Sequence, residues 1–408
     1  MLGIYFLFCL FILFFSKTFV SKKLSNPINV YTIMWFLIFF IHESNFIKIN
    51  EISEETFIII IVAHFFFAFG GCFGFKLKCR LFKCGLHKRN DHDKKRLLKK
   101  ILVITSLIAA IGVVNEFYNN NLLRGSNVVE NFAMMYKDQL EDDRESNFSL
   151  ESLVYVITPL LGVYAFNYGL EKFLLIPLMD LILFGLSNGS RGPFIILMFL
   201  LSAFLTLKYY NKSSADIDRF YDKNKKNIIR TLSVFCMIIF VITLSRNDYE
   251  TNVVDNPIVV FLVTYLAGGI SGLDQFINSP NIVYYPQYFF RVPFILFNKL
   301  DITHIDTFYT VPTFYIPFPT NVYTYIGELI HDFGYFFFIP CFFLGYLSCR
   351  CYYQSISNRS FCSMIIYSGL FSVIGLSFFA NFIHVAALWY VFILGGGIGY
   401  VLDNKIYD

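Results

Sequence analysis

Three ionisable side chains lie close together near the end of a long segment that separates two apolar runs. They are Glu328, His331 and Asp332. Their spacing of i, i+3 and i+4 places them on one face of a helix. A carboxylate beside a histidine is the layout of a positioned general base. Helix capping combined with a surface charge cluster is the simpler interpretation, and the spacing alone leaves both open.

Three arginines on the same predicted side of the chain could bind an anion. Arg191 lies in the turn 187–193, where glycines let the backbone approach a ligand and the start of the next helix presents N–H groups. Arg246 ends an apolar run, and Arg291 lies between aromatic residues, where it must find an anion or stack on rings. The simpler interpretations are an Arg191 that reaches lipid headgroups and an Arg246 paired with Asp248.

The composition indicates that these residues belong to a polytopic membrane protein. Of 408 residues, 56% are hydrophobic and only 15% are charged, against roughly 25% charged in average soluble domains. These values exclude a disordered chain, a nucleic-acid-binding domain and an ordinary soluble enzyme. The net charge of +4 says little, because in a membrane protein the distribution of charge matters more than the total.

Apolar runs of the kind that cross a membrane recur along the chain, each of about 20 residues. The run from Pro257 to Leu273 is ambiguous, and we expect it to be re-entrant or interfacial. We therefore predict an all-α protein with eleven transmembrane helices, or twelve if that run also spans. The eleven lie near 2–16, 25–42, 56–75, 98–115, 152–170, 173–188, 193–208, 228–245, 334–350, 361–380 and 384–401.

The charges of the loops predict the orientation. Residues 76–100 hold eleven Lys/Arg and two Asp, and residues 208–230 hold seven Lys/Arg and three Asp. Both should be cytoplasmic by the positive-inside rule. Residues 43–55 and 115–151 are acidic and should lie outside. One alternating path with an external N-terminus satisfies all four loops.

This path divides the chain into three parts. Residues 1–245 form an N-terminal transmembrane bundle, 246–333 a large external loop, and 334–408 the C-terminal transmembrane helices. The loop is rich in Pro and Tyr, so it is composed to pack against something apolar, and its aromatic faces also suit sugar rings. An aromatic belt at the membrane interface is the alternative. Asp180 lies within a span, where it could pair with an arginine from another helix or face a water-filled cavity.

Several familiar sites are missing from the sequence. There is no phosphate-binding loop of the G-x-x-x-x-G-K-[ST] type, so the chain is not an ATPase subunit. Cys79 and Cys84, with His87 and His92 nearby, have a spacing too loose and surroundings too basic for zinc. We expect no metal site.

Three short segments and the general hydropathy plan resemble a known family. They are the Gly-Ser-Arg-Gly turn at 189–192, Asn-Val-Tyr-Thr at 321–324, and Asp-Phe-Gly at 332–334, which runs into a late span. In this order, with a long external loop, they look like the Wzy family of O-antigen polymerases. The eleven predicted spans differ from the common twelve-span plan. We also find no Arg-x10-Gly or Arg-x15-Gly repeat starting at the three arginines.

The resemblance implies a membrane glycosyltransferase of the GT-C type in the bacterial inner membrane. Such enzymes polymerise oligosaccharide repeat units carried on undecaprenyl diphosphate at the outer face. The expected partners are that lipid-linked oligosaccharide and the bilayer, with a chain-length regulator and a flippase as candidate protein partners. No cofactor, metal ion or nucleic acid is expected. An O-antigen ligase and a flippase or transporter of the lipid-linked unit are the alternative functions.

The residues and the resemblance together suggest roles. A diphosphate leaving group needs cations, and arginine forks match phosphate oxygens. The acceptor hydroxyl needs a base, for which His331 is preferred over Glu328 and Asp332. The sugar contacts fall to two residues of the motif at 321–324. The predicted site thus comprises Arg191, Arg246 and Arg291 for the diphosphate, Glu328, His331 and Asp332 for catalysis, and Asn321 and Tyr323 for the sugar.

Overall fold

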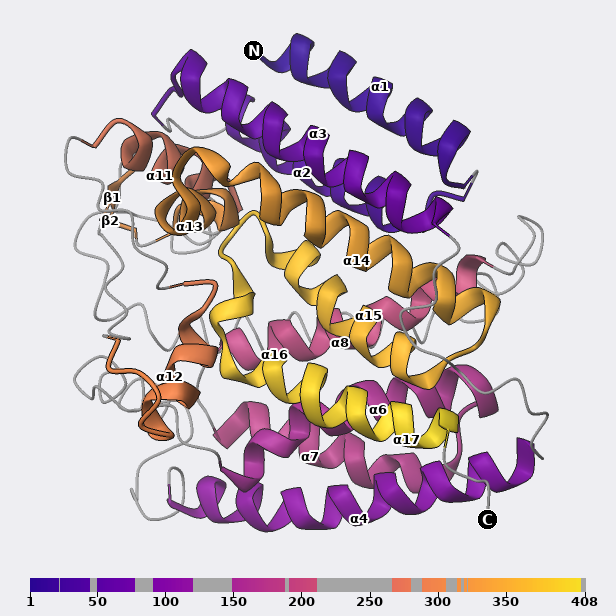
Figure 1. Ribbon diagram of the computed structural model, residues 1–408. Coiled ribbons are helices and arrows are strands. Elements are labelled where there is room, and N and C mark those ends of the chain that lie inside the picture. Colours follow the sequence, from indigo (N-terminus) through magenta and orange to yellow (C-terminus); the bar gives the residue numbers. More distant parts are fainter. Residues whose placement is uncertain are drawn as a thin grey trace. The chain divides into compact units, whose positions relative to one another are not determined.

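The computed structural model describes residues 1–21, 23–44, 50–77, 91–119, 149–187, 191–210, 266–279, 288–305, 314–316, 319–320 and 322–404. Within these ranges the chain is mostly helical (Figure 1). The strands described there are two short ones, β1 (Phe314–Tyr315) and β2 (Pro319–Thr320), which pair antiparallel. The prediction of an all-α fold is therefore confirmed in this coarse form.

The helices are labelled as in Figure 1 and are interrupted by short 3-10 and π turns. In chain order they are α1 (Leu2–Phe19), α2 (Pro27–Glu43), α3 (Glu54–Lys76), α4 (Asp91–Phe117), α6 (Val154–Tyr168), α7 (Leu175–Ser187), α8 (Arg191–Tyr210), α11 (Gly268–Ile277), α12 (Arg291–Lys299), α13 (Thr324–Phe333), α14 (Phe338–Ser357), α15 (Phe361–Leu376), α16 (Ala386–Tyr390) and α17 (Gly396–Asn404).

Ten of the eleven predicted ranges overlap helices of the described chain, and the run 228–245 lies outside the described residues. The number of spans stays a prediction. By length and composition, six helices of the described chain can cross a membrane, and a seventh results if α13 and α14 form one broken span. Those two helices are bent by 117°. The shorter apolar helices are α2 and α15. The protein is therefore an all-α membrane protein.

Local sequence signals explain where the first helices begin. The Asn26 side chain accepts a hydrogen bond from the Asn29 N–H at 3.0 Å, and Pro27 occupies the first position of α2. The Ser53 hydroxyl receives the Thr56 N–H at 3.3 Å at the start of α3. Asn and Ser caps satisfy N–H groups that have no partner within the helix.

The described chain forms two compact units, each assembled from segments remote in sequence. Unit 1 comprises residues 1–81, 258–357 and 369–389. Unit 2 comprises residues 82–257, 358–368 and 390–408. The predicted catalytic helix α13 and Arg291 belong to unit 1, whereas Arg191 belongs to unit 2.

In unit 1, α3 and α14 run parallel in close contact (Figure 1). A Cβ at Gly70 would lie 2.0 Å from the Phe342 carbonyl oxygen, and one at Gly74 would lie 2.1 Å from the Tyr346 carbonyl oxygen. Small residues four apart let helix backbones approach each other in membranes. Gly70 and Gly74 form such a pair, so the interface depends on their missing side chains.

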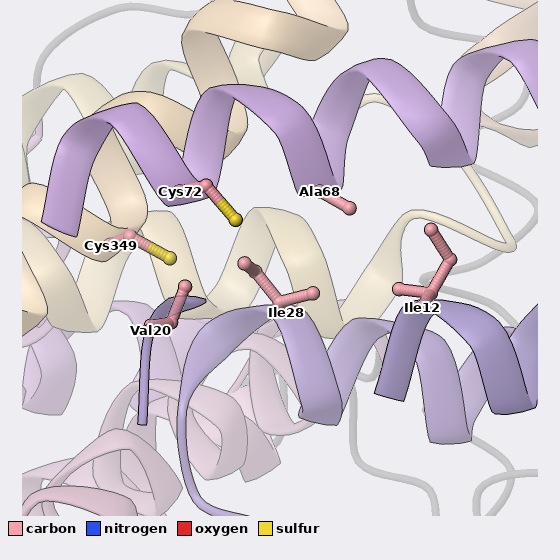
Figure 2. Close-up of a cluster of buried hydrophobic side chains, with 6 residues drawn as sticks. All are labelled: Ile12, Val20, Ile28, Ala68, Cys72 and Cys349. Atoms are coloured by element: carbon pink, nitrogen blue, oxygen red, sulfur yellow. The ribbon is translucent and has the colours of Figure 1, made fainter. Parts of the chain in front are cut away.

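A buried apolar cluster joins four chain segments of unit 1 (Figure 2). Ile28 of α2 lies at its centre, between residues of α3 and the end of α1 (Figure 2). None of the described cysteines forms a disulfide. Because both sulfur-bearing residues of the cluster are buried, they act here as small apolar groups. The cluster consists of Ile12, Val20, Ile28, Ala68, Cys72 and Cys349.

In unit 2, α4 packs against α6 and α7. Lys95 and Lys99 at the start of α4 lie 2.6 and 3.3 Å from the carboxylate of Glu171, in the turn between α6 and α7. These contacts place that turn and the start of α4 at one end, as an alternating path requires. Within the span, the carboxylate of Asp180 accepts a hydrogen bond from the Ser106 hydroxyl. Among the described residues its partner is thus a hydroxyl.

Candidate active site

Helix α13 carries the three predicted catalytic side chains, and its first residue has a strained backbone conformation. It begins at Thr324 with φ of +63°, a conformation that a β-branched residue rarely adopts. The next N–H, of Tyr325, donates to the Ser377 carbonyl oxygen at 2.9 Å. On the other side, a Cβ at Gly272 of α11 would lie 2.1 Å from the Val322 carbonyl oxygen. Such strain persists only where the surrounding structure holds it, and it clusters at functional sites.

The first histidine–carboxylate pair consists of His331 and Asp332. Nδ1 of His331 lies 3.3 Å from Oδ1 of Asp332. The same carboxylate accepts the N–H of Tyr288 at 3.1 Å through Oδ1 and the N–H of Phe289 at 2.5 Å through Oδ2. The Asp332 side chain is fully buried, whereas 15% of the His331 side chain is exposed. Asp332 thus both orients a histidine and holds the segment before α12.

The sequence reasoning missed a second pair, Glu328 with His384. Nδ1 of His384 lies 3.3 Å from Oε2 of Glu328, which also accepts the N–H of Asn381 at 3.0 Å. Glu328 is buried and His384 is half-buried. His384 comes 56 residues after Glu328 in the chain. The available signal was an isolated ionisable residue between two apolar runs, which does not reveal its partner.

Tyr288 brings the two pairs together. Its ring centroid lies 4.7 Å from that of His331, edge to face, and 6.4 Å from that of His384. Burial raises the pKa of the Tyr288 hydroxyl to about 12, so this group stays protonated at neutral pH. The site therefore contains two imidazoles and two carboxylates around one neutral phenol.

This arrangement can remove a proton from a bound hydroxyl group. When Nδ1–H donates to a carboxylate, Nε2 of the same imidazole is left as the proton acceptor. Within the described residues, Nε2 of His331 makes no hydrogen bond. The buried carboxylate beside it stabilises the imidazolium that forms on proton uptake, and this interaction is stronger in a low-dielectric site.

The predicted diphosphate ligands are described to different extents. Arg291 is the first residue of α12, directly after the segment held by Asp332, and its side chain is half-buried. Arg191 is the first residue of α8, but its side chain and the preceding turn lie outside the described residues. Arg246 also lies outside them. Of the three arginines, the structure thus links Arg291 to the histidine site.

The two predicted sugar contacts also differ. Asn321 lies outside the described residues. Tyr323 is buried, with its ring centroid 5.1 Å from that of Phe276 and 5.5 Å from that of Phe314. Tyr288 follows at 6.3 Å. Tyr323 therefore lies in an aromatic cluster that reaches His331 through the rings of Phe276 and Tyr288.

Within the described residues, no three His, Cys, Asp or Glu side chains are grouped so as to hold a metal ion. Cys79, Cys84 and His87 lie outside those ranges. The comparisons add no relative: the chain matches no protein-family model, no curated protein and no solved structure.

Proposed function

We propose that this protein is a membrane glycosyltransferase that polymerises undecaprenyl-diphosphate-linked oligosaccharide units at the outer face of the bacterial inner membrane. The observation that carries the proposal is the pairing of two histidines with buried carboxylates around Tyr288, next to the helix that begins at Arg291. A general base, with an arginine two residues after the segment that Asp332 binds, would meet the two needs of glycosyl transfer from a lipid diphosphate.

The reaction we propose is a single displacement at the anomeric carbon of the growing chain. A hydroxyl group of the new lipid-linked unit attacks that carbon while its proton passes to Nε2 of His331. The bond from the anomeric carbon to the diphosphate oxygen breaks, and both bonding electrons leave with the diphosphate. General-base assistance of this kind contributes about 10²–10⁴-fold to the rate.

Arg291 supplies positive charge to the departing diphosphate in this scheme. The bidentate fork of a guanidinium matches phosphate oxygens, and each charged hydrogen bond is worth about 1.5–3 kcal/mol. Asp332 is then a positioning residue, because its carboxylate holds the backbone of Tyr288 and Phe289 directly before α12. Arg191 and Arg246 remain diphosphate ligands proposed from the sequence.

Glu328 and His384 provide a second base in the same site. Glu328 is held by the Asn381 N–H on one side and orients His384 on the other. We assign this pair to the acceptor sugar, where a neutral imidazole can accept a hydrogen bond from a neighbouring hydroxyl. His331 keeps the base role because its Nε2 has no hydrogen-bond partner within the described residues.

The finer topology belongs to the proposal. We propose eleven transmembrane helices in a GT-C-like arrangement, with the start of α13 facing outside. The parallel course of α3 and α14 supports this path, because both helices then run from outside to inside. The basic segment 76–100 follows α3 on the cytoplasmic side.

Purified protein in proteoliposomes, supplied with a lipid-linked repeat unit, tests the function directly. Polymerase activity predicts a ladder of lengthened, lipid-linked glycans, whereas a pure flippase would move the unit and leave its length unchanged. His92→Ala is a matched control for the site histidines, because His92 is an exposed residue of α4.

Cells lacking the native gene separate a polymerase from a ligase. Loss of a polymerase leaves single repeat units attached to the final acceptor. Loss of a ligase leaves polymer on the lipid carrier, and that outcome would refute our proposal in favour of the ligase.

A further inference from the structure

Helix α12 and the turn after it expose an unusual number of large apolar side chains. Leu296, Phe297, Leu300 and Ile302 are 53%, 39%, 59% and 64% exposed, and Phe290 just before the helix is 37% exposed. A segment of this kind in water rarely exposes so many large apolar side chains. We call Phe290, Leu296, Phe297, Leu300 and Ile302 the α12 tip.

The tip has a fixed shape. The Asn298 side chain donates to the Ile305 carbonyl oxygen at 2.6 Å and accepts from the Thr303 hydroxyl at 2.8 Å and the Ile305 N–H at 3.1 Å. The Leu300 N–H closes the last helical turn on the Leu296 carbonyl oxygen at 3.1 Å. The apolar side chains are therefore displayed by a closed helix-and-turn unit.

The apolar side chains of the tip are about as exposed as those on the outer face of α1. In α1, Ile4, Leu7 and Phe14 are 63%, 66% and 68% exposed, as expected for side chains that contact lipid. Helix α12 has nine residues and is about 14 Å long, too short for a hydrocarbon core of roughly 30 Å. A short helix with such a surface fits the boundary between headgroups and acyl chains.

The charges around the tip favour a lipid surface over a second protein copy. Arg291 begins the helix and Lys299 ends it, while Asp301 is the acidic residue between Phe290 and Ile305. Basic residues flanking an apolar helix face are typical of interfacial helices, because they reach the phosphates while the apolar face enters the acyl region.

We propose that the α12 tip is an interfacial anchor that inserts into the bilayer leaflet on which the active site opens. Insertion of the tip sets Arg291, at the start of the helix, at the level of the phosphates. Asp332 in turn ties the backbone before Arg291 to the histidine site. This consequence for catalysis rests on the proposed function, since a lipid-linked diphosphate lies at the same level. The insertion itself does not depend on the function.

Tryptophan fluorescence of the full-length protein in liposomes tests the insertion. Leu300→Trp and, separately, Phe297→Trp place a reporter on the tip. Tyr315→Trp on β1, an exposed residue of the same predicted loop, serves as the matched control. The signal of the wild-type protein, with its two tryptophans, is subtracted in each case.

Insertion predicts a blue-shifted added emission from both tip variants and its loss in liposomes made of phospholipid brominated near the upper acyl chain. The control should keep its emission there and lose it to aqueous acrylamide. Tip variants that behave like the control would overturn the proposal. The elongation assay is read separately: anchoring without elongation would refute only the proposed function, and elongation without anchoring only the anchor.

Discussion

Two regions of unit 1 use histidines in opposite ways. His64 lies within the bundle of α1, α2 and α3, where Nδ1 is 3.1 Å from the Tyr5 hydroxyl and Nε2 is 2.9 Å from the Thr32 hydroxyl. The Thr32 hydroxyl donates its hydrogen bond to the Ile28 carbonyl oxygen, so Nε2 of His64 must be the donor to Thr32. Both ring nitrogens are then satisfied by neutral groups. Such a histidine supports structure and has no nitrogen left for a substrate.

The histidines around Tyr288 differ in their partners and in their access to solvent. Each has Nδ1 on a carboxylate, and each is partly exposed, with 15% and 12% of the side chains of His331 and His384 accessible. The comparison teaches that the two kinds of histidine differ both in solvent access and in the partners of their ring nitrogens. The partners matter for chemistry, because a carboxylate on Nδ1 prepares Nε2 for proton transfer.

The largest effect in this comparison is expected from Asp332→Ala. Its loss removes the acceptor for the Tyr288 and Phe289 N–H groups and releases the segment before Arg291. We expect elongation in proteoliposomes to fall by about 10²–10⁴-fold, as for loss of a positioned base. Asp332→Asn keeps one acceptor oxygen and should lie between this variant and the wild type. Full elongation by Asp332→Ala would remove the contrast between the two regions.

The position of α13 and its trio could be predicted from sequence, because the i, i+3, i+4 spacing is local. The rest of the site could not. The N–H groups on Asp332 come from residues 44 and 43 positions earlier, and His384 follows Glu328 by 56. The sequence shows which ionisable residues would be costly to bury. Only tertiary packing decides which groups form hydrogen bonds or ion pairs with them.

The three predicted parts of the chain stay a prediction, because they describe the order of membrane spans and loops and not compactness. They follow the linear order of hydropathy, whereas the compact units combine early and late segments. The close contact of α3 with α14 explains why, because Gly70 and Gly74 act on a partner more than 260 residues away. A glycine pair in an apolar run indicates close packing, yet it does not name the partner helix.

A smaller effect, on stability, is expected from His64→Leu. The substitution removes the imidazole partner of the buried Tyr5 hydroxyl, which keeps its hydrogen bond with the Cys9 thiol. We therefore expect a loss of about 1 kcal/mol of unfolding free energy, the lower end of the range for a lost buried hydrogen bond. Thermal unfolding in detergent should show the loss, while the elongation rate per folded molecule stays near that of the wild type. The double variant Tyr5→Phe/His64→Leu should recover part of the stability. A specific loss of elongation would mean that His64 is more than structural.

The smallest effect concerns a partly exposed carboxylate with two lysine partners, which sharpens the contrast with the buried carboxylates. Lys95 and Lys99 hold the pKa of Glu171 at about 2, below its ordinary value of 4.5. A depressed folded-state pKa stabilises the protein above pH 4.5, and this contribution is lost as the pH falls from 4.5 towards 2. Glu171→Gln should slightly reduce the slope of unfolding free energy against pH between pH 4.5 and pH 2. An unchanged slope would show that solvent screens the pair completely.

The most direct test of the central claim compares His331→Ala with His92→Ala in proteoliposomes that contain a lipid-linked repeat unit. If His331 is the base, its loss should reduce the initial rate of glycan lengthening by about 10²–10⁴-fold, with the thermal unfolding midpoint unchanged. His92→Ala should retain the wild-type rate. Wild-type lengthening by a folded His331→Ala variant, or loss of activity in both variants alike, would contradict the account.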